Sequence, residues 1–300
     1  MKKFYYIFLI LVSVMAVSCS EDGVTPHLKD TTLAFLPAAD DNSEEAQLRR
    51  DFYQTYGSFL LFNDTLQHEA LGKDVNGDMH YFTEVLDLTY QVGMSTESNE
   101  KFKVTLLTDM DQKRAAVQYI KDYLLVHLTG NLKPYSWLLV DKIKRDFIGS
   151  VSSPYAATGQ RAIALACNVL PRLTDDQKQQ YTAQVMTTII AKLAGDNAAS
   201  FDDFLQVSAA YYDGSFTAPT TSAENTEMLN QAGFISRGTN EFKQETNGRY
   251  PSQDQDIKAY ARLIVSSTAE ANAKKYADYP LVLKKCDIMR KTLKSLGYVE

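Results

Sequence analysis

The clearest pattern in the chain is a run of apolar residues at helical spacing between Thr174 and Gly195. Thr174 and Gln177 form the capping-box pattern with which many helices begin. Four large apolar residues follow at intervals of four positions: Tyr181, Val185, Ile189 and Leu193. Because this spacing places them on one face of a helix, the sequence predicts a long helix that ends near Gly195.

Further helices are predicted on both sides of this one. Before it, apolar residues from Ala116 to Leu128 recur at helical spacing, and Gly130 stands where the helix would end. After it, turn and capping residues delimit four more helical segments: one from Ser200, one at about 223–233, one from Ser252 to about Thr268, and one at about 281–296.

Apolar runs too short for helices predict strands in the first half of the chain. These runs lie at 56–62, 82–90, 135–140 and 162–170. Pro134 excludes a helix at the start of the third run, and Pro171 follows the fourth. A small mixed sheet in the N-terminal half, followed by a mostly helical C-terminal half, is an α+β fold.

The first eighteen residues have the three parts of a secretory signal. A basic start is followed by about fourteen mainly apolar residues from Phe4 to Val17, and small residues precede Cys19. An apolar segment of this length is too short to span a bilayer core of about 30 Å as a helix. We therefore expect cleavage before Cys19 and lipidation of its thiol, with an ordinary signal peptide as the alternative.

The segment after Cys19 indicates where the mature chain is placed. Ser20-Glu21-Asp22 resembles the short acidic tag of surface-exposed lipoproteins of Bacteroidetes, which implies an outer-membrane protein that faces the cell surface. The residues up to position 45 contain few large apolar groups and many Asp, Thr, Pro and Ser, as in a flexible tether. The predicted organisation is a signal peptide at 1–18, a lipidated cysteine and tether at 19–45, and a single domain at 46–300.

Composition narrows the classes of function. The chain has 31 basic and 37 acidic residues, and loss of Lys2 and Lys3 with the signal makes the mature protein still more acidic. A nucleic-acid-binding protein needs an excess of basic charge, so this class is excluded. Cys167 and Cys286 remain after Cys19 and fit either a disulfide or two buried thiols.

The order of several segments carries a resemblance to a known family. The segments are Pro134–Asp141, Phe201–Phe204, Tyr211–Gly214, Gly233–Ser236 and Tyr276–Tyr298. Together with the long helix, they resemble the zinc-binding metallopeptidase lipoproteins of Bacteroidetes, which are encoded beside outer-membrane systems for glycan uptake. The resemblance implies a zincin-like layout for residues 46–300 and a glycan or an outer-membrane transporter as the partner.

The motif that carries the activity of that family is missing from this chain. In the family, the long helix would carry His-Glu-x-x-His, which binds zinc through two imidazoles. The matching window, residues 185–196, contains neither histidine nor glutamate, and the degenerate positions are represented by Thr187, Thr188 and Ala191. A catalytic zinc ion needs three protein ligands, so we expect no metal, no cofactor and no catalytic residue here.

Other candidate motifs are incomplete. His68-Glu69 begins like the metallopeptidase motif, but its fifth position is Gly72. Residues 74–78 begin like a calcium loop, but Met79 and Val85 occupy the positions of the required glycine and carboxylate, so we expect a polar turn.

Three further side chains or pairs are assigned ordinary structural roles. His127 lies beside an apolar helical stripe, where we expect a half-buried histidine with a hydrogen-bond partner. Asp202-Asp203 and the pair Asp254 and Asp256 are expected to be charges on helix surfaces rather than catalytic carboxylates.

These observations favour a non-catalytic, surface-anchored protein that binds a ligand or takes part in an assembly. The alternative from another class is a working hydrolase that uses a metal site elsewhere or carboxylates alone. A purely structural envelope protein is the third hypothesis.

Overall fold

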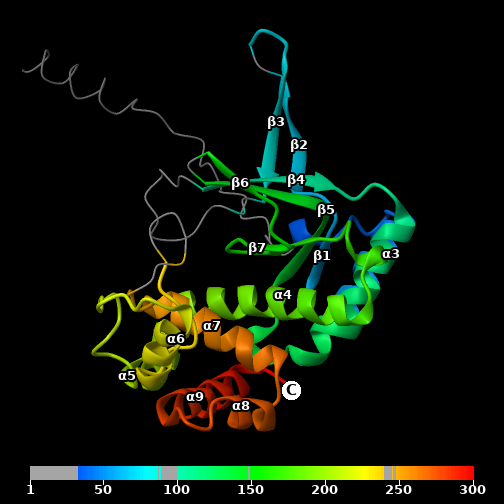
Figure 1. Cartoon of the computed structure of the whole chain (residues 1–300). Helices are drawn as coiled ribbons and strands as arrows, with labels where there is room; N and C mark the ends of the chain where they lie inside the picture. Colours follow the sequence, from blue (N-terminus) through cyan, green and yellow to red (C-terminus); the bar gives the residue numbers. More distant parts are fainter. Residues whose placement is uncertain are drawn as a thin grey trace, which may run out of the picture. The chain divides into compact units, whose positions relative to one another are not determined.

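The computed structural model describes residues 33–73, 75–86, 88, 100–147, 149–239, 245 and 248–300. Contacts divide the chain into Met1–Ala34 and a compact unit, Phe35–Glu300, and the description below concerns the second unit. The fold is α+β, as predicted, with the sheet in the N-terminal half and helices in the C-terminal half (Figure 1).

The main sheet is built around one long strand. Its strands are β1 (Phe59–Leu61), β4 (Glu100–Leu106), β5 (Ser136–Phe147), β6 (Ser150–Ser152), β7 (Ala156–Thr158) and β8 (Ile163–Ala166). The first part of β5 pairs in parallel with β1 on one edge and β8 on the other, and β7 runs antiparallel beside β8. Beyond Val140, β5 pairs instead with β4 and β6, both antiparallel. The sheet is therefore mixed, as the sequence predicted.

The two parts of β5 have different patterns of burial. Ser136–Val140 is buried throughout, because this part has strands on both edges and lies in the main hydrophobic core. After Val140 exposed and less exposed residues alternate, so this part of the strand has one face toward solvent.

Helices form the rest of the compact unit. They are α2 (Glu44–Tyr56), α3 (Met110–Tyr119), α4 (Asp175–Asp196), α5 (Asp202–Gln206), α6 (Ser222–Gln231), α7 (Gln253–Ser266), α8 (Ala269–Lys275) and α9 (Pro280–Leu296). Short 3₁₀ or π turns are η1 (Leu33–Phe35), η2 (Ile120–Leu124), η3 (Leu125–His127), η4 (Gly130–Leu132), η5 (Leu170–Arg172) and η6 (Ala198–Phe201). Helix α4 contacts β7 on one side and α7 on the other, and α7 in turn contacts α9 (Figure 1). Helix α4 is thus the layer between the sheet and the C-terminal helices.

Local capping signals explain where the main helices begin and end. Both parts of the predicted capping box at Thr174 and Gln177 are formed at the start of α4, and a second box at Ser252 begins α7. Helix α9 ends at Gly297, whose φ is 111°. A Cβ at Gly297 would lie 1.9 Å from the carbonyl oxygen of Thr129, so this position requires glycine.

A separate β-hairpin extends from the main sheet. Strands β2 (Thr65–Lys73) and β3 (Met79–Val85) form a two-stranded antiparallel sheet of their own (Figure 1). Gly77, with a φ of 89°, lies in the turn between them, so residues 75–78 form the expected turn, while Asp74 lies outside the described residues. The sequence pattern predicts a strand only near the end of this region, at 82–90, and does not predict a hairpin.

The folded domain begins earlier than position 46. Phe35 is buried and packs against Phe59 and Tyr135, with ring centroids 5.4 and 5.2 Å apart. The guanidinium of Arg49 donates hydrogen bonds to the carbonyl oxygens of Phe35 and Leu60. The prediction of a tether up to residue 45 was therefore wrong at its C-terminal end, because α2 begins at Glu44 and the Phe35 ring and arginine side chains of α2 hold the residues before it.

The two cysteines of the domain are free. Cys167 and Cys286 are both buried thiols. Burial raises the pKa of Cys167 to about 12 and that of Cys286 to about 11. Of the two alternatives that the sequence left open, the structure has the buried thiols.

Candidate functional site

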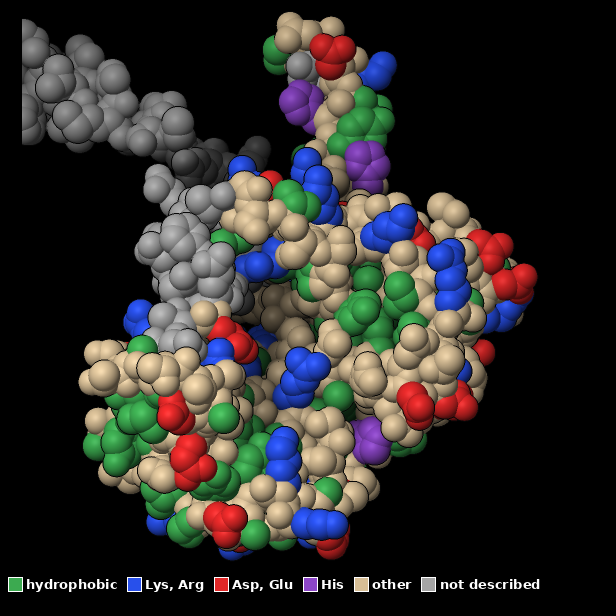
Figure 2. Space-filling view, in the orientation of Figure 1, with side chains coloured by type: hydrophobic (Ala, Val, Ile, Leu, Met, Phe, Trp, Pro, Cys, Tyr) green, Lys and Arg blue, Asp and Glu red, His purple; other side chains and the backbone are tan. Residues whose placement is uncertain are grey.

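A polar cleft of about 720 Å³ lies over the exposed face of α4, between the β7–β8 turn and α7. Three elements line it: Thr158 and Gln160 come from the sheet side, Thr187, Thr188, Ala191, Lys192, Gly195 and Asp196 from α4, and Asp254 and Lys258 from α7. Figure 2 shows the surface hollowed between the sheet-bearing half and the helices. The structure therefore brings all three degenerate positions, Thr187, Thr188 and Ala191, into one cleft.

The α4 side of the cleft is lined by small hydroxyl-bearing side chains. Thr187 Oγ1 donates a hydrogen bond of 2.7 Å to the carbonyl of Ala183, and Thr188 Oγ1 donates one of 3.0 Å to that of Gln184. The hydroxyl protons are thus used within the helix, while each oxygen keeps acceptor capacity. These threonines can accept hydrogen bonds from a ligand, but neither is activated as a nucleophile by a neighbouring base.

Two ion pairs from adjacent helices supply the charge of the cleft. Lys192 contacts Asp196 at 2.5 Å on α4, and Lys258 contacts Asp254 at 2.6 Å on α7. All four side chains are partly exposed, so each pair contributes little to stability. Because each ammonium and carboxylate can exchange its partner for a ligand group at low cost, the pairs provide donors and acceptors together.

A smaller cavity of about 160 Å³ adjoins the cleft. It shares Gln160, Lys192 and Asp196 with the cleft and continues toward Tyr135, whose side chain is half exposed. The Lys192–Asp196 pair therefore lines both cavities.

A buried ion pair fixes the helix that forms one wall of the cleft. Asp256, two residues after Asp254 on α7, contacts Lys285 of α9, and both side chains are fully buried. Tyr212 Oη donates a hydrogen bond of 2.6 Å to the same carboxylate oxygen. The prediction that Asp256 is a surface charge was therefore wrong. Asp254 faces the cleft and Asp256 faces the core, because residues two positions apart on a helix point in different directions.

Aromatic rings surround the buried ammonium group. Lys285 Nζ lies 4.5 Å from the ring centre of Phe204, 4.7 Å from that of Phe234 and 4.8 Å from that of Tyr260. Burial raises the pKa of Asp256 and lowers the pKa of Lys285, and their contact opposes both shifts. Among the described residues, Asp256 Oδ1 has no hydrogen-bond partner. Because both side chains are buried, we assign the Asp256–Lys285 pair a structural role.

The residues present do not fit a zinc ion. Helix α4 offers the cleft hydroxyl, methyl, ammonium and one carboxylate group, and no imidazole. Within the described ranges, no group of three or more His, Cys, Asp or Glu side chains lies close enough together to hold a metal. A zinc-dependent step at this cleft therefore has no ligand set in the part of the chain that the structure describes.

The other histidine candidates have structural partners. His68 lies on the hairpin, where its ring stacks on Tyr81 and its Nδ1 lies 2.9 Å from Thr83 Oγ1. The Nδ1 of His127 lies 2.7 Å from the carbonyl oxygen of Val299, and the residue is partly buried, as predicted.

The lipidation candidate, Cys19, lies outside the described residues. Across the ranges that the structure describes, no helix is both long and apolar enough to cross a bilayer.

Some residues of the cleft were not identified from the sequence as parts of one site. Gln160, Asp254 and Lys258 reach the cleft only because the β7–β8 turn and α7 pack against α4. Asp254 and Lys258, like Lys192 and Asp196, have the four-residue spacing of ion pairs on helix surfaces, but this spacing gives no indication that the two helices meet. Comparison of the chain with models of protein families, with curated proteins and with solved structures finds no match.

Proposed function

We propose that this chain is a lipid-anchored, non-catalytic protein of the outer membrane. It faces the cell surface and binds a glycan or a component of a glycan-uptake complex. The observation that supports it best is the chemistry of the cleft over α4. Hydroxyl, amide and paired charged groups line this cleft, and the imidazoles of a zinc helix are absent from it. Such a lining supplies many hydrogen bonds and no reactive centre.

The resemblance to zincin-like metallopeptidase lipoproteins agrees with this proposal. The resemblance implies a long helix that presents zinc ligands to a cleft, and here the long helix α4, which contacts β7, presents Thr187, Thr188 and Ala191 to one. We infer that the scaffold was retained while the metal site was lost. The same cleft then serves for binding alone.

The proposed attachment of the protein to the outer membrane depends on lipidation of Cys19. The basic start, the apolar segment and the small residues before Cys19 support export and lipidation, and the acidic residues after it support exposure at the cell surface. Acyl chains bind a bilayer with about 0.8 kcal/mol for each buried CH₂ group, so anchoring needs no spanning helix.

The anchoring part of the proposal is tested by Cys19→Ala. We expect the variant either to be released from the membrane fraction or to persist as an uncleaved precursor, because it has no thiol to receive the lipid. Membrane fractionation and mass spectrometry of the N-terminal peptide distinguish these outcomes from normal processing. A Cys19→Ala chain that is cleaved at the same bond and remains membrane-bound would refute the anchor. Cys286→Ala is the matched control, since it removes a thiol that we expect to play no part in processing.

A further inference from the structure

Four lysines share one face of the antiparallel ribbon formed by β4 and the second part of β5. The register pairs Lys103 with Lys144, Lys101 with Asp146, and Thr105 with Lys142. Side chains directly opposite one another in an antiparallel pair lie on the same face, about 5 Å apart at Cβ, and the next pair on that face follows about 7 Å along the strand. Lys101, Lys103, Lys142 and Lys144 therefore form a compact basic surface, called here the lysine face.

The lysine face is open to solvent. All four lysines are exposed, whereas Ile143 between two of them is buried on the opposite side of the ribbon. In the described part of the chain, the only ion pair that any of the four makes is a marginal one, 4.0 Å long, between Lys142 and Asp141. Asp146, which lies opposite Lys101, accepts a hydrogen bond from the backbone of Gly149.

The clustering of four lysines on one face destabilises the folded state by charge repulsion. Like charges placed directly opposite each other in a sheet, as at Lys103 and Lys144, destabilise the strand pair. The chain as a whole is acidic, so the local excess of positive charge does not follow from composition. An anionic ligand would remove the repulsion and gain from the field of all four ammonium groups.

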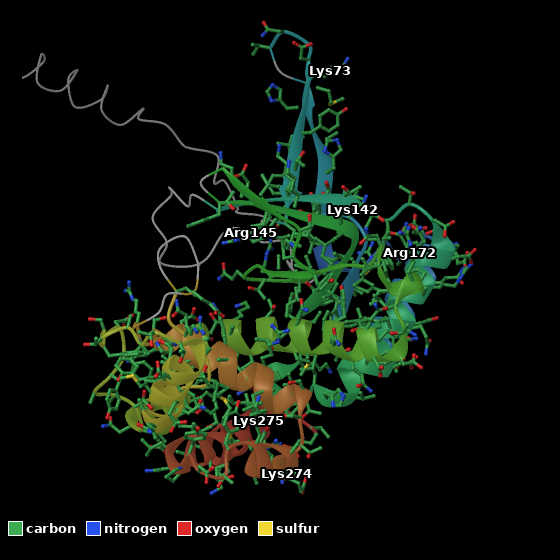
Figure 3. All side chains as sticks on the ribbon, in the orientation of Figure 1. Lys73, Lys142, Arg145, Arg172, Lys274 and Lys275 are labelled. Carbon is green, nitrogen blue, oxygen red and sulfur yellow. The ribbon has the colours of Figure 1, made fainter. Side chains whose placement is uncertain are left out.

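The basic surface continues into a small cavity of about 120 Å³. Lys142 and Arg172 both line this cavity, together with the amides of Gln112 and Asn168 and the carboxylate of Asp141. Figure 3 shows the labelled Lys142 and Arg172 on the same side of the molecule. Ammonium, guanidinium and amide groups at one end of the lysine face provide donors for the carboxylate or sulfate groups of a chain that lies along it.

We propose that the lysine face binds an acidic polysaccharide, carboxylated or sulfated. The inference rests on the proposed function, in which the protein binds a glycan at the cell surface, and it names the chemical class of that glycan. Charge complementarity favours a polyanionic chain, because the described register adds one apolar side chain, Val151 of β6, to the lysine face. The exposed apolar residues of the β2–β3 hairpin belong to a separate sheet, and a lipid surface is an outcome of the test below. Two rows of lysines match an extended polyanion, whose charges repeat along its length.

The test uses the full-length lipoprotein in detergent micelles and measures its retention on immobilised polygalacturonate and dextran sulfate, with neutral dextran as the blank. The variant carries Lys101→Gln, Lys103→Gln, Lys142→Gln and Lys144→Gln. The matched control carries Lys274→Gln, Lys275→Gln, Lys284→Gln and Lys291→Gln, which removes the same charge from exposed positions of α8 and α9. Lys274 and Lys275 lie far from Lys142 in Figure 3.

We expect the unaltered protein to bind at least one polyanion at low salt and to elute at high salt, since exposed charges are screened. The lysine-face variant should bind at least about tenfold more weakly, while the control variant binds as the unaltered protein does. Equal binding by the two variants, or binding to neither polyanion, would overturn the proposal. Loss of retention when phosphatidylglycerol is mixed into the micelles would assign the face to a lipid surface, which also overturns it. The lipid anchor is tested separately by Cys19→Ala. Failure of the anchoring proposal can therefore be distinguished from failure of the polysaccharide-binding proposal.

Discussion

At the scale of single residues, the buried pair of Asp256 and Lys285 determines how α7 is seated. When one partner of a buried ion pair is removed, the other charge stays buried without compensation, and the folded state is strongly destabilised. Phe204, Phe234 and Tyr260 surround the ammonium group, and both charged side chains are buried, so loss of one leaves the other buried without its partner. The pair therefore fixes one orientation of α7 on α9, and with it the position of Asp254 and Lys258 in the cleft.

We expect Lys285→Met to lower the free energy of unfolding by about 3–5 kcal/mol, because it leaves the Asp256 carboxylate buried and unpaired. Adding Asp256→Asn should recover part of this loss, since the second substitution removes the isolated charge. Denaturant unfolding of the unaltered protein, both single variants and the double variant measures the coupling. Lys284→Met is the control, because Lys284 is exposed on the same helix. A Lys285→Met protein as stable as Lys284→Met would show that the pair does not hold the helices together.

The sequence allowed some residue roles to be predicted and not others. Thr187, Thr188 and Ala191 were singled out because the resemblance to a zinc helix implies its ligand positions there, and all three line the cleft. The burial of Asp256 was missed, because its partner Lys285 lies on α9, 29 residues along the chain. Periodicity assigns a residue to a face of its own helix, but it does not say which neighbouring helix covers that face.

At the scale of elements, predictions succeeded where capping and periodicity agree. Helices α4, α7 and α9 begin and end close to the expected residues, because each has a capping box, a first-turn proline or a terminal glycine. Helix α2 was missed because few of its residues are large and apolar. Its signals were Ser43 at the N-cap, two glutamates in the first turn and Gly57 at the end.

The second part of β5 was missed for a related reason. Residues 141–146 are mostly charged, as in many loops, yet Ile143 between Lys142 and Lys144 is buried. The alternation is that of a strand with one solvent-facing side, and β4 and β6 supply its hydrogen bonds. The hairpin of β2 and β3 has exposed apolar residues, Leu71 and Val75 among them, so hydrophobic alternation does not mark it.

Helix α4 provides a test of which of its faces is buried. We expect Ile189→Asp to lower the free energy of unfolding by about 3–5 kcal/mol, because the new carboxylate would lie in the core without a partner. Lys192→Ala, less than one turn away, should change it by no more than about 1 kcal/mol, since its ion pair with Asp196 is partly exposed. Thermal or denaturant unfolding of the two variants gives the comparison. The reverse order of stabilities would mean that α4 faces the core with the side assigned here to the cleft.

At the scale of the whole molecule, α4 connects the two halves of the domain. It packs on β7 with one side and on α7 with the other, and the cleft opens where these contacts leave its polar face uncovered. The α+β class and the order of elements were predictable from the sequence, because they follow from local patterns. The cleft and its adjoining cavity were predictable only on the α4 side, since the remaining lining residues depend on tertiary packing.

The central claim, that this cleft binds without catalysing, is tested most directly by zinc. A ligand raises the melting temperature only if it prefers the native state, and the cleft has no imidazole to create that preference. We therefore predict that the full-length protein, purified in detergent, contains much less than one zinc per chain and melts at the same temperature with chelator or with micromolar zinc. Stoichiometric zinc, a rise of several degrees that chelator reverses, and zinc-dependent cleavage of a protein substrate would contradict the account. Loss of that rise in His68→Ala or His80→Ala would place the unexpected metal site on the hairpin.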